Sequence, residues 1–335
     1  MPGMNSFGID LGTSNIKIYS HADESILVEK NMIAIEGKKN IFAYGDSAYE
    51  MYEKAPSNIH ISFPLSDGVI ADIRNMEDLV KFFINDLSRN NIKTADYFIA
   101  VPTDVTEVEK KAFYDLIKEA DVKARHVWVV EKAIADGLGM DIDVKNAQGV
   151  LVVDVGYDTT EISILSLGGI VRTRLVKVGG YKFDEAIKNA VRKTYNLVIG
   201  QKTAENVKNS LRTLEKEGKG ATVFGLDLVS RLPVERELST KFVCESMADM
   251  FRVVIDNIKV ILEIAPPELA ADIYRHGIYL TGGASQTSHL ASLISKSTGL
   301  KVNESENPVT SVALGLSKVI KDPNYRSVAY SIEGK

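Results

Sequence analysis

Residues 149–165 read GVLVVDVGYDTTEISIL, two apolar runs separated by a short polar turn. The valine-rich run at 150–153 is typical of a strand buried on both faces, and the alternation at Ile162 and Ile164 predicts a second strand that pairs with it as a hairpin. Asp154 ends the first strand, where a poorly solvated carboxylate needs a partner such as a hydrated divalent metal. Gly156 and the turn N–H groups after it favour a concave anion site. The hairpin is therefore interpreted as half of a phosphate clamp.

The same pattern occurs near the N-terminus, where residues 7–20 read FGIDLGTSNIKIYS. Asp10 aligns with Asp154 and Gly12 aligns with Gly156, and each glycine opens a turn that contains hydroxyl side chains. One such pattern is weak evidence, because acidic turns are common. Two copies separated by 144 residues (154 minus 10) indicate a duplicated domain that holds a ligand between its halves.

Length and composition restrict the class of protein. A chain of 335 residues is long for one core, so two domains are expected. The net charge of −5 gives no electrostatic argument for nucleic acid as a partner. The single cysteine, Cys244, excludes an internal disulfide and a cysteine-based zinc site, fits a reducing cytoplasm, and is expected to be a small core residue. We recognise neither a signal peptide nor an apolar run long enough to span a membrane, so a cytoplasmic location is expected.

Two expected strands end at candidate positions for the ligand site, one directly before a helix and one before a glycine turn. Residues 127–130 form one expected strand, which leads Glu131 and Lys132 into a helix. Residues 278–281 form the other, which leads into the glycine turn at 282–284. Open α/β sheets bind ligands at such junctions, so side chains there are candidates for the site.

Seven motifs carry a resemblance to a known family. They are IDLGTSN at 9–15, DGVIAD at 67–72, VVDVGYDTTE at 152–161, VGGYKFDEAI at 178–187, TAENVK at 203–208, APPELAADI at 265–273 and LTGGAS at 280–285. With them the chain resembles the actin, Hsp70 and sugar-kinase superfamily, and within it the bacterial actin family MreB. The motifs run in order through nearly the whole chain.

The resemblance implies an α/β fold of two duplicated actin-like (ribonuclease H-like) domains with a nucleotide cleft between them. Domain I is expected at 1–144, with a small inserted subdomain at about 30–66, and a C-terminal helix at 308–335 is expected to return to it. Domain II is expected at 145–307, with an inserted subdomain at about 181–255.

The resemblance also implies ATP or ADP with Mg²⁺ as the ligands. Asp10 and Asp154 would hold the metal. The residues expected around the nucleotide are Gly12, Thr13, Ser14, Asn15, Lys17, Gly156, Tyr157, Glu205, Lys208, Gly282, Gly283 and Ala284. Glu205 and Lys208 match the pair that contacts ribose and adenine in the family, whereas the plain alternative is a surface salt bridge between residues three apart, which would contribute little. Glu131, Thr159 and Asp158 are the catalytic candidates.

Three positions depart from the family pattern. Lys132 stands where MreB proteins have an acidic residue that orients the attacking water, and a charged lysine cannot accept the proton of that water. Tyr157 and Asp158 replace the usual glycines of the phosphate turn, and Lys17 adds a cation. The hypothesis is that nucleotide binds but is hydrolysed slowly, because water positioning carries much of phosphoryl-transfer catalysis. The alternative is that Glu131 or Asp158 has taken over the water, with Thr159 as a second contact.

The function implied by the resemblance is that of a cytoskeletal protein that polymerises head to tail and governs cell shape. The altered site resembles that of divergent paralogues in wall-less helical bacteria, which implies a narrower role in helicity or motility and paralogous filament proteins as partners. A nucleotide-gated scaffold without turnover and a small-molecule kinase are the alternatives. Membrane association is not favoured, because the N-terminus and the loop at 88–96 lack an amphipathic pattern. A position beneath the inner face of the cell membrane stays an open alternative.

Overall fold

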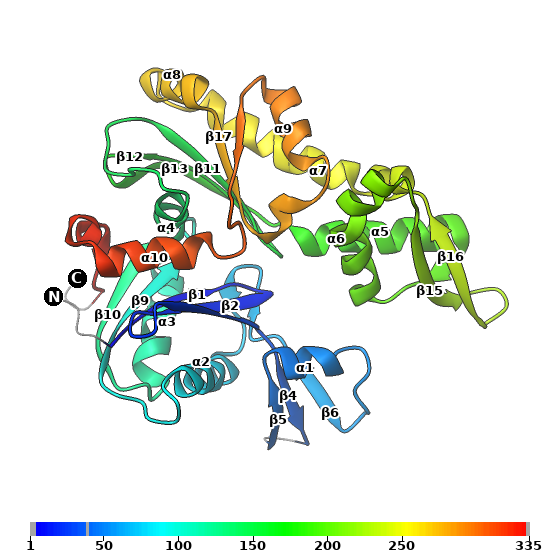
Figure 1. The fold of residues 1–335 in the computed structure, drawn as a ribbon, viewed down its shortest axis with the longest axis horizontal. Coiled ribbons are helices and arrows are strands. Elements are labelled where there is room, and N and C mark those ends of the chain that lie inside the picture. The colour runs from blue at the N-terminus through cyan, green and yellow to red at the C-terminus, as the bar shows by residue number, and fades with distance from the viewer. Residues whose placement is uncertain (1–4, 38–39, 333–335) are drawn as a thin grey trace.

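The protein, described by a computed structural model over residues 5–37 and 40–332, contains two large sheets with two helices between them (Figure 1). The first sheet has the strand order β19-β10-β9-β1-β2-β3 and the second has the order β13-β12-β11-β17-β18. The first consists of β1 (Ser6–Leu11), β2 (Asn15–Ser20), β3 (Ser25–Lys30), β9 (Ala95–Val101), β10 (Ala124–Glu131) and β19 (Ala329–Tyr330). The second consists of β11 (Val150–Val155), β12 (Thr160–Ser166), β13 (Gly169–Val176), β17 (Ile278–Thr281) and β18 (Val302–Glu304).

Both sheets are built in the same way. An antiparallel meander of three strands comes first, β1 to β3 or β11 to β13. A later strand, β9 or β17, then pairs in parallel with the first strand of the meander, and a further strand, β10 or β18, pairs in parallel with that one. The registers match as well, since Asp10 pairs with Lys17 across the first hairpin and Asp154 pairs with Glu161 across the second. The predicted duplicated α/β fold is confirmed.

The apolar pattern of β11 places this strand between two cores. Leu151 and Val153 belong to the core of the second domain, whereas Val150 and Val152 belong to the core between the domains. Side chains alternate between the faces of a strand, so a strand buried on both faces must be apolar throughout. This is why the run at 150–153 gave a clear prediction.

Helices form layers around the two sheets. Helices α2 (Ile73–Leu87) and α3 (Glu107–Glu119) pack on one face of the first sheet, and α5 (Gly180–Tyr195), α7 (Thr240–Glu263) and α9 (Leu290–Thr298) pack on one face of the second. Helices α4 (Lys132–Gly139) and α10 (Ser311–Lys321) lie between the sheets (Figure 1). They cross so closely that a Cβ at Gly315 would lie 1.8 Å from the carbonyl oxygen of Ala135. Glycine is therefore required at this crossing.

Two smaller sheets project from the domains (Figure 1). One contains β4 (Ile33–Glu36), β5 (Asn40–Tyr44) and β6 (Ile59–Ser62) beside helix α1 (Asp46–Met51). The other contains β14 (Leu197–Val198), β15 (Ala221–Asp227) and β16 (Pro233–Leu238) beside α6 (Gln201–Glu217). The remaining elements are the hairpin of β7 (Leu65–Ser66) and β8 (Val69–Ile70), helix α8 (Pro267–His276), and the 3₁₀ turns η1 (Gly283–Gln286) and η2 (Pro323–Val328). The domain boundaries at residues 144 and 307 stay a prediction.

The C-terminal segment differs from the single helix expected over 308–335. Helix α10 ends at Lys321, Asp322 caps η2 through the backbone N–H of Asn324, and β19 then pairs with β10 of the first sheet. Pro323 explains the stop, because proline cannot continue a helix with regular hydrogen bonding. Residues 333–335 lie outside the described range.

The loop considered for membrane contact is part of the domain surface. Ile92 is half-buried and packs against the core of the first domain. Residues 1–4, the start of the segment also considered for membrane contact, lie outside the described range. Among the described residues, no helix combines the length and apolar character needed to cross a bilayer.

Candidate functional site

A cleft of about 400 Å³ lies between the two domains, and the duplicated hairpins β1–β2 and β11–β12 both contribute to its lining. Fifteen of the residues predicted to bind metal or nucleotide, or to act in catalysis, line it. They are Asp10, Gly12, Thr13, Ser14, Asn15, Lys17, Asp154, Gly156, Tyr157, Thr159, Glu205, Lys208, Gly282, Gly283 and Ala284. The structure thus brings together residues that are up to 274 positions apart in the chain (284 minus 10).

Each of the two predicted metal-binding carboxylates is paired with a lysine. Lys17 Nζ lies 3.0 Å from Asp10 Oδ2, and Lys132 Nζ lies 2.5 Å from Asp154 Oδ2. Both aspartates are almost completely buried. Burial opposes the charge on Lys132, but the carboxylates of Asp154 and Asp10 outweigh this effect and raise the pKa of Lys132. Lys132 is therefore a cation at neutral pH.

The backbone at Gly282 is shaped by its contact with Asp154. Gly282 follows β17 with φ +89°, and a Cβ there would lie 2.1 Å from Asp154 Oδ1 and 2.4 Å from the carbonyl oxygen of Val155. Only glycine combines this φ with so close an approach. The glycine turn therefore packs directly against Asp154 and Val155 at the end of β11.

Glu205 and Lys208 do not form the surface salt bridge that was their plain alternative. Glu205 accepts a hydrogen bond from the Tyr49 hydroxyl at 3.0 Å, which connects helix α6 to α1 across the cleft. Lys208 is buried, lies 2.7 Å from Asp184 Oδ1, and donates to the carbonyl oxygen of Gly180 at 3.2 Å. Burial raises the pKa of Asp184 to about 6, although Lys208 opposes the shift. Glu205 is thus held in the lining by Tyr49, and Lys208 is held there by Asp184.

The three predicted catalytic residues have different environments. Thr159 lines the cleft, whereas Glu131 and Asp158 are outside its lining. Glu131 Oε1 accepts hydrogen bonds from Lys110 Nζ and from the Tyr330 hydroxyl, both at 2.9 Å. Asp158 Oδ2 accepts from the backbone N–H of Asp67 at 3.0 Å. Two of the three candidates are therefore held by hydrogen bonds outside the lining of the cleft.

Sequence reasoning gave no role to two buried acids at this site. Glu161 lines the cleft and accepts a hydrogen bond from the backbone N–H of Thr103, and burial raises its pKa to about 7. Asp136 is buried beside Ser311, whose hydroxyl donates to it at 2.6 Å, and burial raises its pKa well above the usual range. The repeat contained a signal for Glu161, because it follows Asp154 at the same spacing at which Lys17 follows Asp10.

A second contact crosses the cleft between α1 and α6. Glu53 Oε1 accepts from the backbone N–H of Gln201 at 2.9 Å and Glu53 Oε2 accepts from that of Lys202 at 3.4 Å, at the start of α6. Gly200, the cap residue of α6, has no side chain to do this. Lys202 Nζ in turn lies 4.2 Å from the ring centroid of Tyr49. We call Glu53, Tyr49, Gln201 and Lys202 the clasp.

The cleft has the chemistry of a site for an anionic ligand with a cation. Its two turns present backbone N–H groups and hydroxyls, and lysines and carboxylates alternate around them. The wall formed by Gly282, Gly283 and Ala284 offers backbone and little side chain, which suits a flat ring.

Comparison with known proteins gives consistent findings. A family profile described as MreB/Mbl protein matches residues 4–327. The chain is 34% identical over 326 residues to the cell shape-determining protein MreB of Escherichia coli K12, covering 95% of this chain and 93% of that one. It is 35% identical over 314 residues to the cell shape-determining protein Mbl of Bacillus subtilis 168, covering 92% and 93%.

A solved structure is similar over nearly its whole length. The crystal structure of MreB5 of Spiroplasma citri bound to AMPPNP has a TM-score of 0.89 with 32% identity and covers 98% of this chain and 99% of that one. The ADP-bound crystal structure of the same protein has a TM-score of 0.87 with 31% identity, with coverage of 96% and 98%.

Proposed function

The chain belongs to the MreB/Mbl family, and on this premise we propose that it is an actin-like protein that binds ATP and ADP, assembles head to tail into filaments and governs cell shape. The observation that carries the proposal is that the duplicated hairpins bring Asp10 and Asp154 to one cleft. The names of the E. coli and B. subtilis relatives support the role in cell shape. The proposal includes a cytoplasmic location, paralogous filament partners and a narrower role in helicity or motility, all of which rest on the family resemblance.

The nucleotide is proposed to lie along the cleft. Its phosphates lie between the turn at 12–15 and the turn at 156–159, where backbone N–H groups and hydroxyls are available. Its ribose and base lie toward Glu205 and Lys208 and against the glycine turn at 282–284. The AMPPNP- and ADP-bound structures of S. citri MreB5 support this placement, because that protein shares the fold and a third of the sequence.

Magnesium fits the carboxylates of the cleft. Asp10 and Asp154 would hold the ion, since Mg²⁺ prefers oxygen ligands and both carboxylates are buried at the phosphate end. When bound, the ion neutralises phosphate charge. Lys17 and Lys132 form ion pairs with the same two carboxylates and partly neutralise them. Less negative charge is therefore left on Asp10 and Asp154 to attract the ion.

Hydrolysis is proposed to be slow. Lys132 occupies the position of the water-orienting acid and donates to Asp154, so it offers no acceptor for the proton of the water. Glu131 and Asp158, the possible substitutes, are held by Lys110 and Asp67 outside the lining. A second candidate function follows from the same observation: a scaffold gated by nucleotide binding alone, in which turnover is absent.

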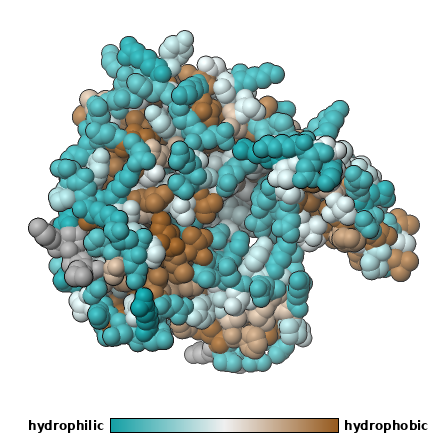
Figure 2. All heavy atoms as spheres, viewed as in Figure 1, coloured by the Kyte–Doolittle hydropathy of each residue, from teal (hydrophilic) through white to brown (hydrophobic). Residues whose placement is uncertain are grey.

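Self-association is supported by an exposed apolar patch. Its members are Val198, Phe224, Leu226, Val229 and Leu232, all on or beside the β15–β16 hairpin. Figure 2 shows the apolar side chains at the outer end of this hairpin. Exposed patches of this kind are typical of contacts between proteins. We therefore place a subunit contact at this end of the molecule.

One experiment tests the proposal by following phosphate release and pelleting with ATP, ADP and AMPPNP. Pelleting with ATP and AMPPNP together with little phosphate release is expected. Brisk release would contradict slow turnover, and a failure to pellet with every nucleotide would contradict filament assembly. Lys132→Glu is expected to raise phosphate release, and the exposed Lys259→Glu is the matched charge control. Equal rates in Lys132→Glu and the unmodified protein would contradict the role given to Lys132.

A further inference from the structure

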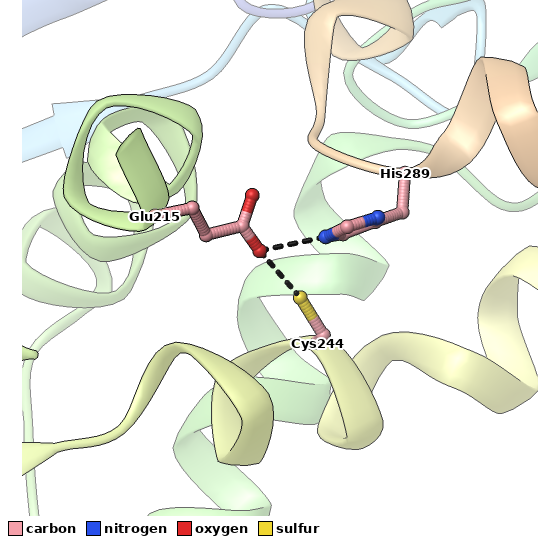
Figure 3. A group of neighbouring side chains, drawn as sticks. All are labelled: Glu215, Cys244 and His289. Carbon is pink, nitrogen blue, oxygen red and sulfur yellow. Dashed lines mark hydrogen bonds and ion pairs between the residues drawn. The ribbon is translucent and has the colours of Figure 1, made fainter. Parts of the chain in front are cut away.

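Three metal-binding side chain types meet at one point of the second domain, away from the nucleotide cleft (Figure 3). Glu215 comes from the end of α6, Cys244 from the start of α7, and His289 directly precedes α9. Figure 3 shows their polar atoms pointing toward one another. One oxygen, one sulfur and one nitrogen lie within 4.8 Å of one another.

The distances between these atoms are close to those of a tetrahedral zinc site. Cys244 Sγ lies 3.3 Å from Glu215 Oε1, and His289 Nε2 lies 2.6 Å from the same oxygen. Zn–S, Zn–N and Zn–O bonds of about 2.3, 2.0 and 2.1 Å at tetrahedral angles place such atoms about 3.5 Å apart. The sulfur–oxygen distance already fits, and the nitrogen–oxygen distance opens by less than 1 Å with a side-chain rotation of the half-exposed His289.

The charge at the cluster also favours a dication. Burial acts to raise the pKa of Glu215, but hydrogen bonds from Ser288, His289 and Cys244 outweigh it and lower the pKa, so the carboxylate is ionised. Burial and this carboxylate raise the pKa of the Cys244 thiol to about 12, so the thiol is protonated without a metal. A bound dication neutralises the carboxylate and stabilises the thiolate at the same time.

We propose that Glu215, Cys244 and His289 form a zinc site with a water as the fourth ligand. Binding of Zn²⁺ forms one Zn–S, one Zn–N and one Zn–O bond and releases the thiol proton to solvent. The proton that His289 Nε2 donates to Glu215 in the metal-free protein also leaves to solvent, and Nδ1 takes up a proton in exchange, so the ring stays neutral. The half-exposed ring of His289 leaves the fourth position open to water. A single cysteine excludes a zinc site built from several cysteines, but the proposed site needs only one sulfur ligand. Its other two ligands come from distant parts of the chain.

Such a site would connect two segments that line the nucleotide cleft to helix α7. Helix α6 carries Glu205 and Lys208 in the cleft, and Thr287, two residues before His289, lines the same cleft. Helix α7 contributes to the core of this domain through Val243 beside the ligand Cys244. The metal would therefore brace the domain behind the nucleotide site, and Zn²⁺ is expected to raise the melting temperature.

The test uses the full chain, stripped of metal with a chelator and titrated with Co²⁺ and then Zn²⁺. A thiolate-to-cobalt charge-transfer band with the visible bands of tetrahedral Co²⁺ is expected at one ion per chain, and Zn²⁺ is expected to displace it. Cys244 is the only cysteine of the sequence, so this band has one possible source. Absence of the band in the unmodified protein would overturn the proposal.

Variants assign the other ligands. Cys244→Ser is expected to abolish the band and the rise in melting temperature. His289→Gln and Glu215→Gln are each expected to weaken Co²⁺ binding by about tenfold or more, while the exposed His60→Gln leaves it unchanged. Circular dichroism confirms that each variant is folded. Co²⁺ affinity that is the same in His289→Gln as in the unmodified protein would overturn the site, as would equal loss in His60→Gln.

Discussion

The clasp across the cleft leads to a prediction about nucleotide exchange. Glu53 caps the N-terminus of α6 from the opposite domain, and α6 has no side-chain cap of its own at Gly200. A side-chain cap of a helix contributes about 0.5–2 kcal/mol, and we take about 1 kcal/mol for this exposed one. Because this contact exists only when α1 and α6 are close, its loss favours an open cleft. Glu53→Ala is therefore expected to raise the rate of nucleotide dissociation about fivefold.

The assay is the dissociation of a fluorescent ADP analogue chased with unlabelled ATP. Glu50→Ala is the matched control, because Glu50 meets Lys202 through its backbone carbonyl, which alanine retains. Salt screens exposed charges, so dissociation from the unmodified protein is expected to speed up with salt more than dissociation from Glu53→Ala. If a folded Glu53→Ala variant releases the analogue at the unmodified rate, the clasp does not control the cleft.

Three further predictions follow from other contacts. Lys132→Met leaves Asp154 buried without its cation. Urea unfolding of the nucleotide-free variant is expected to show a loss of about 3–5 kcal/mol in the free energy of unfolding, and a loss below about 1 kcal/mol would contradict the pairing. Burial raises the pKa of Asp184 in the folded protein from 3.8 to about 6. Between these pH values the folded protein holds a proton that the unfolded chain has lost, so the free energy of unfolding is expected to fall by about 3 kcal/mol as the pH rises through this window. Urea unfolding of Asp184→Asn is expected to lack this slope, and an equal slope in both proteins would exclude Asp184 as its source. Val229→Asp places a charge in the patch at the β15–β16 hairpin and is expected to reduce pelleting with ATP while thermal stability is unchanged; undiminished pelleting would remove the patch from the subunit contact.

The hairpins could be predicted from sequence because their signal is local. A strand buried on both faces must be apolar, and a tight turn needs glycine. Both signals occur twice, because the pattern is repeated at 7–20 and 149–165. The same reasoning could not decide between Glu131 and Lys132. Glu131 is the last residue of β10 and Lys132 is the first residue of α4, but neighbouring residues at such a junction point to different sides, and Lys132 is the one that lines the cleft. The contact from Glu53 to α6 spans 148 residues and has no local pattern, so sequence gave no sign of it.

The substitutions at the site are connected by the charge balance of the repeat. In the first hairpin, the residue across from Asp10 is Lys17, so the carboxylate meets a cation within its own sheet. In the second hairpin the corresponding residue is Glu161, which adds an acid beside Asp154. Burial of two adjacent carboxylates is unfavourable unless one is protonated or a cation is near. Lys132 supplies that cation from the start of α4. An acid at position 132, as the family pattern has, would put a further negative charge against Asp154 and Glu161, and the pair would then depend on a bound metal. The lysine proposed above to leave the attacking water without an acceptor is thus also the cation that allows Asp154 and Glu161 to be buried side by side.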